Sequence, residues 1–315
     1  MAKRSGLVHK PKEAQASLTP AIPLATHQAV VDTCTDVPEM EPAFPLPLNS
    51  VGISSKTVWI QLPQGTLPFE AEIMTDLPGR FRGIHMSRME HAISALFDKP
   101  FDDIRNYSER LCQLVLSGQK GSQATVSIKG KIPLVTRTSV SNEISTESVD
   151  IYTNTLGDKA GGQIETFSTI GLSITHITAC PCTQVYNAAC FKEADNHPMP
   201  THSQRCTTTL WVEDQERKLS FSHLYDCLKA CLHISQDLLK RPDEAELVLK
   251  SHEEPQFVED VVRLAAFEAA RQFEGLISGN SKIVIEAESL ESIHQHNVKC
   301  ELACTLSEIL EKVQY

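Results

Sequence analysis

The order in which strand-like and helix-like patterns follow one another constrains the fold of this chain more than any other feature. Along Thr57–Leu62 and Phe69–Ile73, apolar residues alternate with polar ones, as they do in half-buried strands. Two helical stripes and three more strand-like segments come next in the first half: Met89, Ile93, Leu96 and Phe97; Ile104, Tyr107, Leu111, Leu114 and Val115; then Ala124–Leu134, Glu147–Tyr152 and Gln163–Ile177.

The second half repeats this order. A strand at Arg205–Val212 precedes a helical stripe from Leu224 to Leu239 that stops at Pro242, and a further stripe begins at Phe257. Two closing strands are predicted, at Lys282–Glu288 and Val298–Leu306. Strands, two helices and strands, occurring twice, predict an internally duplicated α+β fold. We expect a proline-rich, extended arm at 1–50, a first unit at 51–178 and a second unit at 179–315.

Composition excludes several functional classes. The 315 residues carry a formal net charge of −11, which argues against binding to a nucleic-acid backbone. No run of eighteen apolar residues occurs, so we expect no membrane span. The basic start Met1–Arg4 is not followed by the apolar segment of a signal peptide, and we expect a cytoplasmic protein whose ten cysteines are reduced.

The densest chemistry follows the strand-like segment that ends at Ala179. Cys180-Pro181-Cys182 places two thiols at a strand end, and proline stiffens the turn between them. His202 follows after Thr183–Thr201, which we expect to be a long functional loop. Thiolate and imidazole are ligands of catalytic transition metals, so a metallo-hydrolase is one hypothesis. Packed cysteines are the alternative, and the close spacing disfavours a disulfide.

Carboxylates and histidines downstream form a second group. Glu291, His294 and His296 lie within six residues, and on a strand or a helix two of the three would point the same way. Such a pair suits general acid–base catalysis, while a polar loop between two strands is the alternative. Glu244, at a helix end broken by proline, and Glu259, opposite an apolar stripe, are surface carboxylates on sequence grounds alone.

Three arginines and a histidine lie between Arg80 and Arg88. They precede a predicted helix for which Ser87 is a possible N-cap. Backbone donors at a helix start, together with arginines, can bind phosphate groups. A solvated basic loop is the alternative.

Six segments taken together resemble the GTP cyclohydrolase type IB family, from about residue 36 to residue 306. This resemblance implies a tunnelling fold (T-fold), with two tandem ββααβ-like units of antiparallel sheet and helices on one face. It also implies a homotetramer with active sites at subunit interfaces. The segments are Gly83-Ile84-His85-Met86-Ser87-Arg88, Cys180-Pro181-Cys182, His202 with Gln204-Arg205, Lys240–Glu244, Phe257-Val258-Glu259-Asp260 and Glu291-Ser292-Ile293-His294-Gln295-His296.

The resemblance also assigns roles. One divalent metal, Zn, Fe(II) or Mn, would be held by Cys180, His202 and Glu244, with Cys182 an alternative to Cys180 as ligand. Glu259 would accept N–H donors of the guanine ring. The implied reaction converts GTP and water to 7,8-dihydroneopterin triphosphate and formate, the first step of folate or pterin biosynthesis. The remaining active-site groups would be Cys182, Glu291, His294 and His296, and the triphosphate contacts would be Arg82, His85, Arg88 and Arg205.

Three alternatives stay open. The interval Thr183–Thr201 is longer than in the bacterial pattern and is more like that of the archaeal branch, whose product is the 2′,3′-cyclic phosphate; it also makes His197 a rival ligand to His202. A nicotinamide-dependent nitrile reductase of queuosine biosynthesis shares the implied fold but needs no metal trio. A non-catalytic protein with a structural zinc would need four ligands, commonly as paired CxxC sets, which this sequence lacks.

Overall fold

The computed structural model describes residues 21–159, 161–191 and 198–313. Its elements in chain order are α1 (Leu24–Thr33), a short 3-10 helix η1 (Val37–Glu39), β1 (Leu48–Leu62), β2 (Gly65–Leu77), α2 (Met86–Ser94), α3 (Ile104–Gly118), β3 (Gln123–Arg137), β4 (Ile144–Asp158), β5 (Glu165–Ala179), α4 (Pro181–Phe191), β6 (Ser203–Glu213), α5 (Phe221–Lys229), β7 (His233–Ile234), α6 (Arg241–Glu253), α7 (Val258–Phe273), β8 (Lys282–Leu290), β9 (Val298–Thr305) and α8 (Leu306–Val313).

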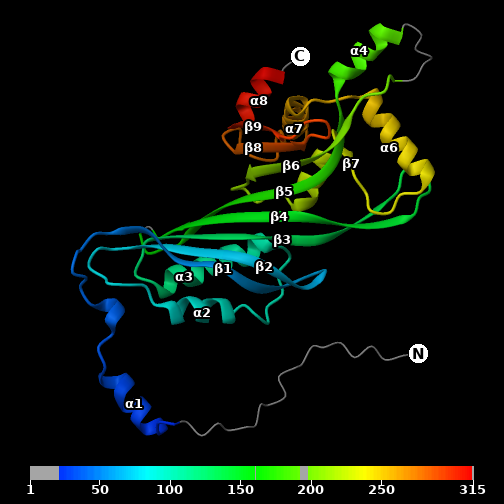
Figure 1. Cartoon of the computed structure of the whole chain (residues 1–315). Helices are drawn as coiled ribbons and strands as arrows, with labels where there is room; N and C mark the ends of the chain where they lie inside the picture. Colours follow the sequence, from blue (N-terminus) through cyan, green and yellow to red (C-terminus); the bar gives the residue numbers. More distant parts are fainter. Residues whose placement is uncertain (1–20, 160, 192–197, 314–315) are drawn as a thin grey trace, which may run out of the picture.

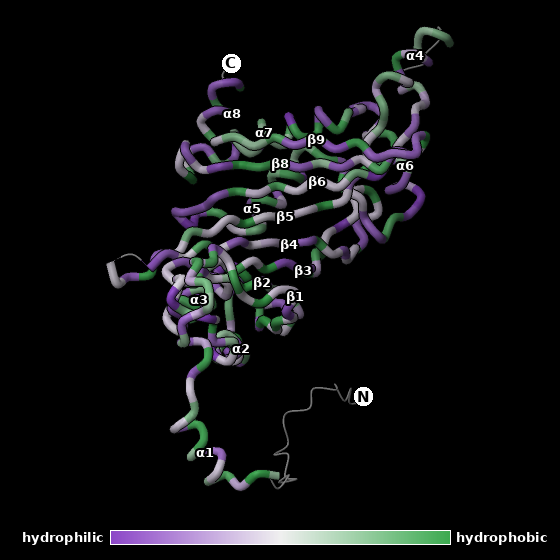
Figure 2. Tube along the Cα trace, turned by 60° about the vertical axis from the view of Figure 1, so that its left-hand side comes forward, coloured by the Kyte–Doolittle hydropathy of each residue, from purple (hydrophilic) through white to green (hydrophobic). Residues whose placement is uncertain are grey.

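One nine-stranded antiparallel sheet runs through both halves of the chain. The strands lie in the order β1-β2-β3-β4-β5-β6-β8-β9, and short β7 pairs with β5 beside this path. Figure 2 shows this stack from β9 at the top to β1 at the bottom. Every strand predicted from alternation is present, and most are longer than predicted. The α+β T-fold expectation is confirmed.

The alternation of apolar residues explains the two layers. Phe69, Ala71 and Ile73 on β2 are buried, while the residues between them are exposed. The buried side of the sheet is covered by helices: α3 packs on β3 and β4, α5 on β5, and α7 on β8 and β9. Their apolar side chains form one continuous core across both halves. The helix layer therefore fixes which face of each strand end can carry accessible polar groups.

The first half has the element order ββααββ. From β5, the second half repeats the order of strands, helices and strands, with α4 added between β5 and β6 and with β7 and a third helix added between β6 and β8. Residues 178 and 179 both lie within β5, so the strand continues across the predicted boundary. The division into units at 51–178 and 179–315 stays a prediction. In the arm, α1 has no buried residue and projects away from the sheet (Figure 1), while residues 1–20 lie outside the described residues.

The helix predicted from Leu224 to Leu239 is confirmed as far as Lys229 and is wrong beyond it. Helix α5 ends at Lys229, His233 and Ile234 then pair with β5 as β7, and a new helix, α6, begins at Arg241. Pro242 stands in the first turn of α6, where a helix does not need the missing N–H, so it marks a start and not a stop. The strand predicted to end at Leu306 stops at Thr305, because Leu306 begins α8.

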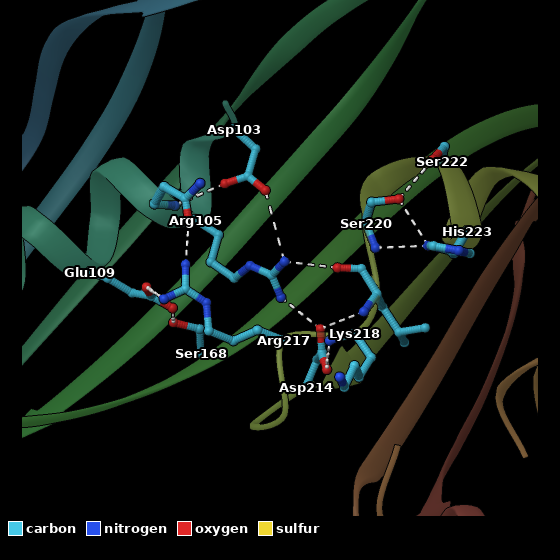
Figure 3. A network of polar contacts seen from close by, with 12 residues as sticks. Asp103, Arg105, Glu109, Ser168, Asp214, Arg217, Lys218, Ser220, Ser222 and His223 are labelled. Atoms are coloured by element: carbon cyan, nitrogen blue, oxygen red, sulfur yellow. Dashed lines mark hydrogen bonds and ion pairs between the residues drawn. The ribbon is translucent and has the colours of Figure 1, made fainter. Parts of the chain in front are cut away.

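A buried polar network joins the two halves (Figure 3). Arg105 on α3 donates to Asp214, after β6, at 2.6 Å and to the carbonyl oxygen of Leu219 at 2.8 Å. Asp214 is almost fully buried and also accepts the backbone N–H groups of Lys218 and Leu219. Beside this pair, Arg217 and Glu109 form an ion pair with 2.9 Å between nitrogen and oxygen. We call these four residues the junction. It ties α3 to the loop that leads into α5.

In the part of the chain that the structure describes, no helix is long and apolar enough to cross a membrane.

Candidate functional site

The ends of β5 and β6 bring the predicted thiol and imidazole together. Ala179 pairs with Ser203, and the Cys180 N–H donates to the His202 carbonyl oxygen at 3.0 Å. Continued by one residue, this register sets Cys180 directly opposite His202. Residues opposite one another in an antiparallel pair share a face, with Cβ atoms about 5 Å apart. The thiol and the imidazole are therefore neighbours on one side of the sheet, as two ligands of one ion must be.

Gln204 orients the His202 ring. Its Oε1 lies 3.1 Å from His202 Nδ1, and strand spacing of i and i+2 puts both side chains on the same face. When Nδ1 carries the proton and donates to Gln204, the lone pair of Nε2 is turned outward for a ligand bond. The sequence motif contains Gln204, but no role was predicted for it. The i, i+2 spacing was the signal that could have identified one.

Cys182 lies in the first turn of α4, three positions after the last residue of β5. Pro181 is the first residue of α4, Cys182 is exposed and Cys180 is half-buried. The expectation of a loop over Thr183–Thr201 is wrong for its first part, because α4 continues to Phe191. The rival ligand His197 lies outside the described residues.

Glu291 extends the same face onto a third strand. Leu290 on β8 pairs with Arg205, so Glu291 follows opposite Gln204, and it accepts a hydrogen bond from Ser289 Oγ at 2.7 Å. Arg205 has the other parity and projects from the opposite face of β6 in the same chain. We call Cys180, His202, Gln204 and Glu291, at the adjoining ends of β5, β6 and β8, the sheet-end cluster.

Two histidines stand beside this cluster in the β8–β9 connection. Residues 291–297 form neither helix nor strand, so the polar-loop alternative holds for their backbone. The rings of His294 and His296 nevertheless stack, with centroids 5.2 Å apart and an interplanar angle of 13°. Both are exposed. The two titratable rings therefore lie together, although a loop holds them and not the strand or helix on which the prediction depended.

Helix α7 begins at the same end of the sheet. The N–H of Gln256 donates to the carbonyl oxygen of Ala179 at 3.1 Å, which ties the start of α7 to the residue before Cys180. Glu259 lies in the first turn of α7 and is exposed. The predicted guanine-binding carboxylate therefore belongs to the same region of the fold as the sheet-end cluster.

Glu244 does not join Cys180 and His202 within one chain. It lies in the first turn of α6, whereas the other end of α6 contacts α4 through Gln184 Nε2 and the carbonyl oxygen of His252 at 2.6 Å. The eight residues from Glu244 to His252 span about 12 Å of helix. Glu244 was also predicted at a helix end, and the structure places it at a helix start.

The predicted phosphate contacts Arg82, His85 and Arg88 lie in the first half, around the start of α2. Figure 1 shows α2 far from α4 and α6. His85, and not Ser87 as predicted, is the N-cap residue of α2. A site that uses these residues together with the sheet-end cluster has to draw them from different copies of the chain.

Among the described residues, the group of three metal-ligand types with neighbouring ligand atoms is Asp36, Glu39 and His85. Lys120 Nζ stands 3.0 Å from Glu39 Oε1, and this hydrogen bond and charge lower the pKa of Glu39. Arg88 lies 3.9 Å from the same oxygen. Two cations already lie beside Glu39, and His85 lies 3.9 Å from Asp36, so the contacts of this group hold η1 against α2.

Buried cysteines elsewhere are poor ligands. Burial raises the pKa of the Cys112 and Cys206 thiols to about 12, so both stay protonated near neutral pH. Burial of Cys227 in α5 also raises the pKa of its thiol. Metal binding requires the thiolate, which leaves the more accessible Cys180 and Cys182 as the candidates near His202.

Comparison with known proteins agrees with these motifs. Residues 34–300 match the family model described as type I GTP cyclohydrolase folE2. The chain is 28% identical over 309 residues to a GTP cyclohydrolase MptA of Methanoculleus marisnigri, covering 88% of this chain and 98% of the relative. It is 30% identical over 274 residues to a GTP cyclohydrolase MptA of Thermoplasma volcanium, covering 83% and 92%.

Solved structures share the fold at low sequence identity. A uricase from Bacillus fastidious superposes with a TM-score of 0.50 at 7% identity, covering 84% of this chain and 96% of the uricase. A uricase from Arthrobacter globiformis gives 0.50 at 8% identity, covering 82% and 93%. These likenesses concern the T-fold alone. With its motifs in order along the matched residues, the chain belongs to the type I GTP cyclohydrolase folE2 family.

Proposed function

We propose that this protein is a metal-dependent GTP cyclohydrolase that converts GTP and water to 7,8-dihydroneopterin triphosphate and formate. The observation that carries the proposal is the placement of Cys180 opposite His202, with Gln204 holding the imidazole. An accessible thiol and an oriented imidazole on one face suit a borderline-soft divalent ion such as Zn, Fe(II) or Mn. We assign Glu244 of a neighbouring copy of the chain as the third ligand, because within one chain Glu244 does not join Cys180 and His202.

A divalent metal bound there would supply Lewis-acid activation of the water that attacks C8 of the guanine base. The protein's own groups then do the rest. Glu259 accepts the ring and amino N–H donors of guanine, so a purine without those donors leaves a carboxylate unpaired. The stacked His294 and His296 supply the proton that the leaving ring nitrogen requires, with Glu291 and Cys182 as further active-site groups. C8 leaves as formate after both of its C–N bonds are broken.

The separation of α2 from the sheet-end cluster supports a site shared between subunits. Arg82, His85 and Arg88 would reach the triphosphate from a neighbouring copy, and Arg205 would do so from the other face of its own sheet. We therefore propose a homotetramer with sites at subunit interfaces, as the family resemblance implies.

A second product is supported by one observation. The interval between Cys182 and His202, which contains α4, is longer than in the bacterial pattern and resembles the archaeal branch. In that case the same ring opening would end in the 2′,3′-cyclic phosphate, with the β- and γ-phosphates released as pyrophosphate. The two products share every step at C8, so the residue assignments above hold for both.

Anaerobic incubation of metal-reconstituted protein with GTP tests the proposal. We expect formate to appear in step with pterin fluorescence after oxidation. Phosphatase treatment before and after mild acid separates the linear triphosphate from the cyclic phosphate, because the cyclic ester resists phosphatase until it is opened. A reconstituted protein that binds metal but releases no formate from GTP would refute the assignment.

Two substitutions separate binding from metal retention. Glu259→Ala should raise the KM for GTP by roughly 100-fold or more, because two charge-assisted hydrogen bonds are lost, and should leave metal content unchanged. Cys180→Ala should lose both metal and activity. Metal analysis of the two purified variants checks this, and a normal metal content in Cys180→Ala would move the ligand role to Cys182.

A further inference from the structure

The segment before α6 is fastened along the tip of the β3–β4 hairpin, which belongs to the first half. Gln236 Nε2 donates to Thr136 Oγ1 at 2.7 Å, and the Leu238 N–H donates to Ser145 Oγ at 3.0 Å. The Asp237 N–H donates to Glu147 Oε1 at 3.2 Å. Figure 1 shows α6 beside the far ends of β3 and β4. The start of α6 is thus set by contacts about a hundred residues away in sequence.

Asp243 completes this attachment. Its Oδ1 accepts the N–H groups of Val140 and Ser141, both at 2.9 Å, and its Oδ2 accepts Ser141 Oγ at 2.6 Å and the Lys240 N–H at 3.2 Å. The side chain is 1% exposed. The Ser141 hydroxyl bond holds the pKa of Asp243 well below its usual range. A buried carboxylate with four donors and no cation among them is a directional clamp on the helix start.

Helix geometry links this clamp to the neighbouring residue. Asp243, Glu246, Leu247 and Lys250 recur at i, i+3, i+4 and i+7 and line one cavity of about 400 Å³ against the hairpin. Glu244 stands about 100° further round the helix, since an α-helix has 3.6 residues per turn. It is exposed. Fixing Asp243 against the hairpin therefore fixes the direction of the Glu244 Cα–Cβ bond, and with it the side of α6 from which the carboxylate is presented.

We propose that Asp243, held by the Val140–Ser141 turn, is a positioning residue for the metal ligand Glu244. This inference rests on the proposed function, in which Glu244 completes the metal site. The hairpin of the first half then takes part in metal binding without touching the metal. Loss of the clamp should weaken metal affinity by about 10–100-fold, the usual cost of removing a group that orients a ligand.

The test compares Asp243→Asn with a matched control elsewhere in the chain. Asp76 accepts the N–H groups of Ser122 and Gln123 on Oδ1, both at 2.7 Å, and Ser122 Oγ on Oδ2 at 3.2 Å. Asp76→Asn therefore removes the same pattern of bonds from a turn in the first half. Co²⁺ binding by equilibrium dialysis, the Co²⁺ absorption spectrum and the thermal midpoint are measured for wild type, both variants and Glu244→Gln.

We expect Asp243→Asn to raise the Co²⁺ dissociation constant about 10–100-fold and to alter the ligand-field bands. Asp76→Asn should lower the thermal midpoint similarly but leave Co²⁺ affinity and spectrum unchanged. If Asp243→Asn does not fold, Ser141→Ala removes one bond of the clamp and should shift the same two quantities less. Wild-type affinity and spectrum in whichever of these two variants is folded would overturn the inference.

The Glu244→Gln variant distinguishes the two levels of the argument. Loss of Co²⁺ affinity in Glu244→Gln with normal binding in Asp243→Asn refutes the positioning role and leaves the proposed function intact. Unchanged Co²⁺ affinity in Glu244→Gln refutes the ligand role of Glu244, and with it any positioning role of Asp243. Formate release from GTP by wild type is assayed separately, so a failure of the proposed function is visible by itself.

Discussion

The junction and the sheet-end cluster are both polar, yet they use their polar groups in opposite ways. At the junction, Arg105 and Asp214 are buried, and the two terminal guanidinium nitrogens and both carboxylate oxygens bond to one another or to the surrounding backbone. At the sheet end, Cys180 is half-buried, and one ring nitrogen of His202 is hydrogen-bonded to Gln204 Oε1, which accepts. Buried polar groups that are hydrogen-bonded to one another stabilise a fold, whereas polar groups that are oriented but remain accessible can bind a ligand. The difference predicts that stability and metal binding can be altered independently.

The largest effect on stability is expected at the junction. Arg105→Met should lower the free energy of unfolding by about 3–5 kcal/mol, because it leaves the Asp214 carboxylate buried without its cation. Arg217→Gln is the matched control: its partner Glu109 is buried, but the arginine is half-exposed, so the loss should be about 1 kcal/mol. Urea unfolding measures both. Equal losses in the two variants would mean that burial does not distinguish the two ion pairs.

His176 on β5 lies close to the sheet end, but we expect it to affect stability, as the junction does, and not metal binding, as His202 does. His176 is fully buried against Thr208 Oγ1 at 2.8 Å, and burial lowers its pKa to about 4. In the unfolded chain, His176 binds a proton below about pH 6.5. In the folded protein it does so only below about pH 4. The contribution of neutral His176 to the free energy of unfolding is therefore fully present above pH 6.5. This contribution falls by about 3 kcal/mol between pH 6.5 and pH 4.

His176→Gln isolates this contribution. Other groups titrate in the same range, so the quantity to compare is the change in unfolding free energy with pH in wild type minus that in the variant. The variant should lose less stability as the pH falls. Parallel profiles for the two proteins would mean that the imidazole is free to take up its proton in the folded state.

The smallest expected effect lies at the sheet-end cluster. Gln204→Leu keeps the shape of a buried side chain but removes the acceptor for His202 Nδ1, and metal affinity should fall by about 10–100-fold. Thr208→Val, further along β6, removes the partner of His176 and should leave metal affinity unchanged. Competition with a chromogenic chelator measures both. Unaltered affinity in Gln204→Leu would show that the ring does not need this orientation.

Much of the fold could be predicted because it depends on local patterns. Period-two alternation predicted the strands, since over much of the sheet one face is buried under helices. The placement of Cys180 near His202 followed from two strand ends that are joined by one connection. Alternation and strand ends are properties of neighbouring residues, which a single sequence displays directly.

The errors have non-local causes. The apolar spacing from Leu224 to Leu239 continues past Lys229 by coincidence, and pairing of His233 and Ile234 with β5 overrides it. Helix α4 has no buried residue, so it lacks the apolar stripe by which a helix is recognised. The attachment of Asp243 to the Val140–Ser141 turn joins positions that no local pattern relates.

The Val140–Ser141 turn is recognised mainly through its main chain. Val140 bonds to Asp243 through its backbone N–H, so its side chain is free to differ among relatives. Proline is the exception, because it has no backbone N–H. Changing the number of residues between Arg137 and Ile144, which pair across the hairpin, would instead move both donors out of reach. Across evolution, then, the length of this turn should be inherited more strictly than its composition.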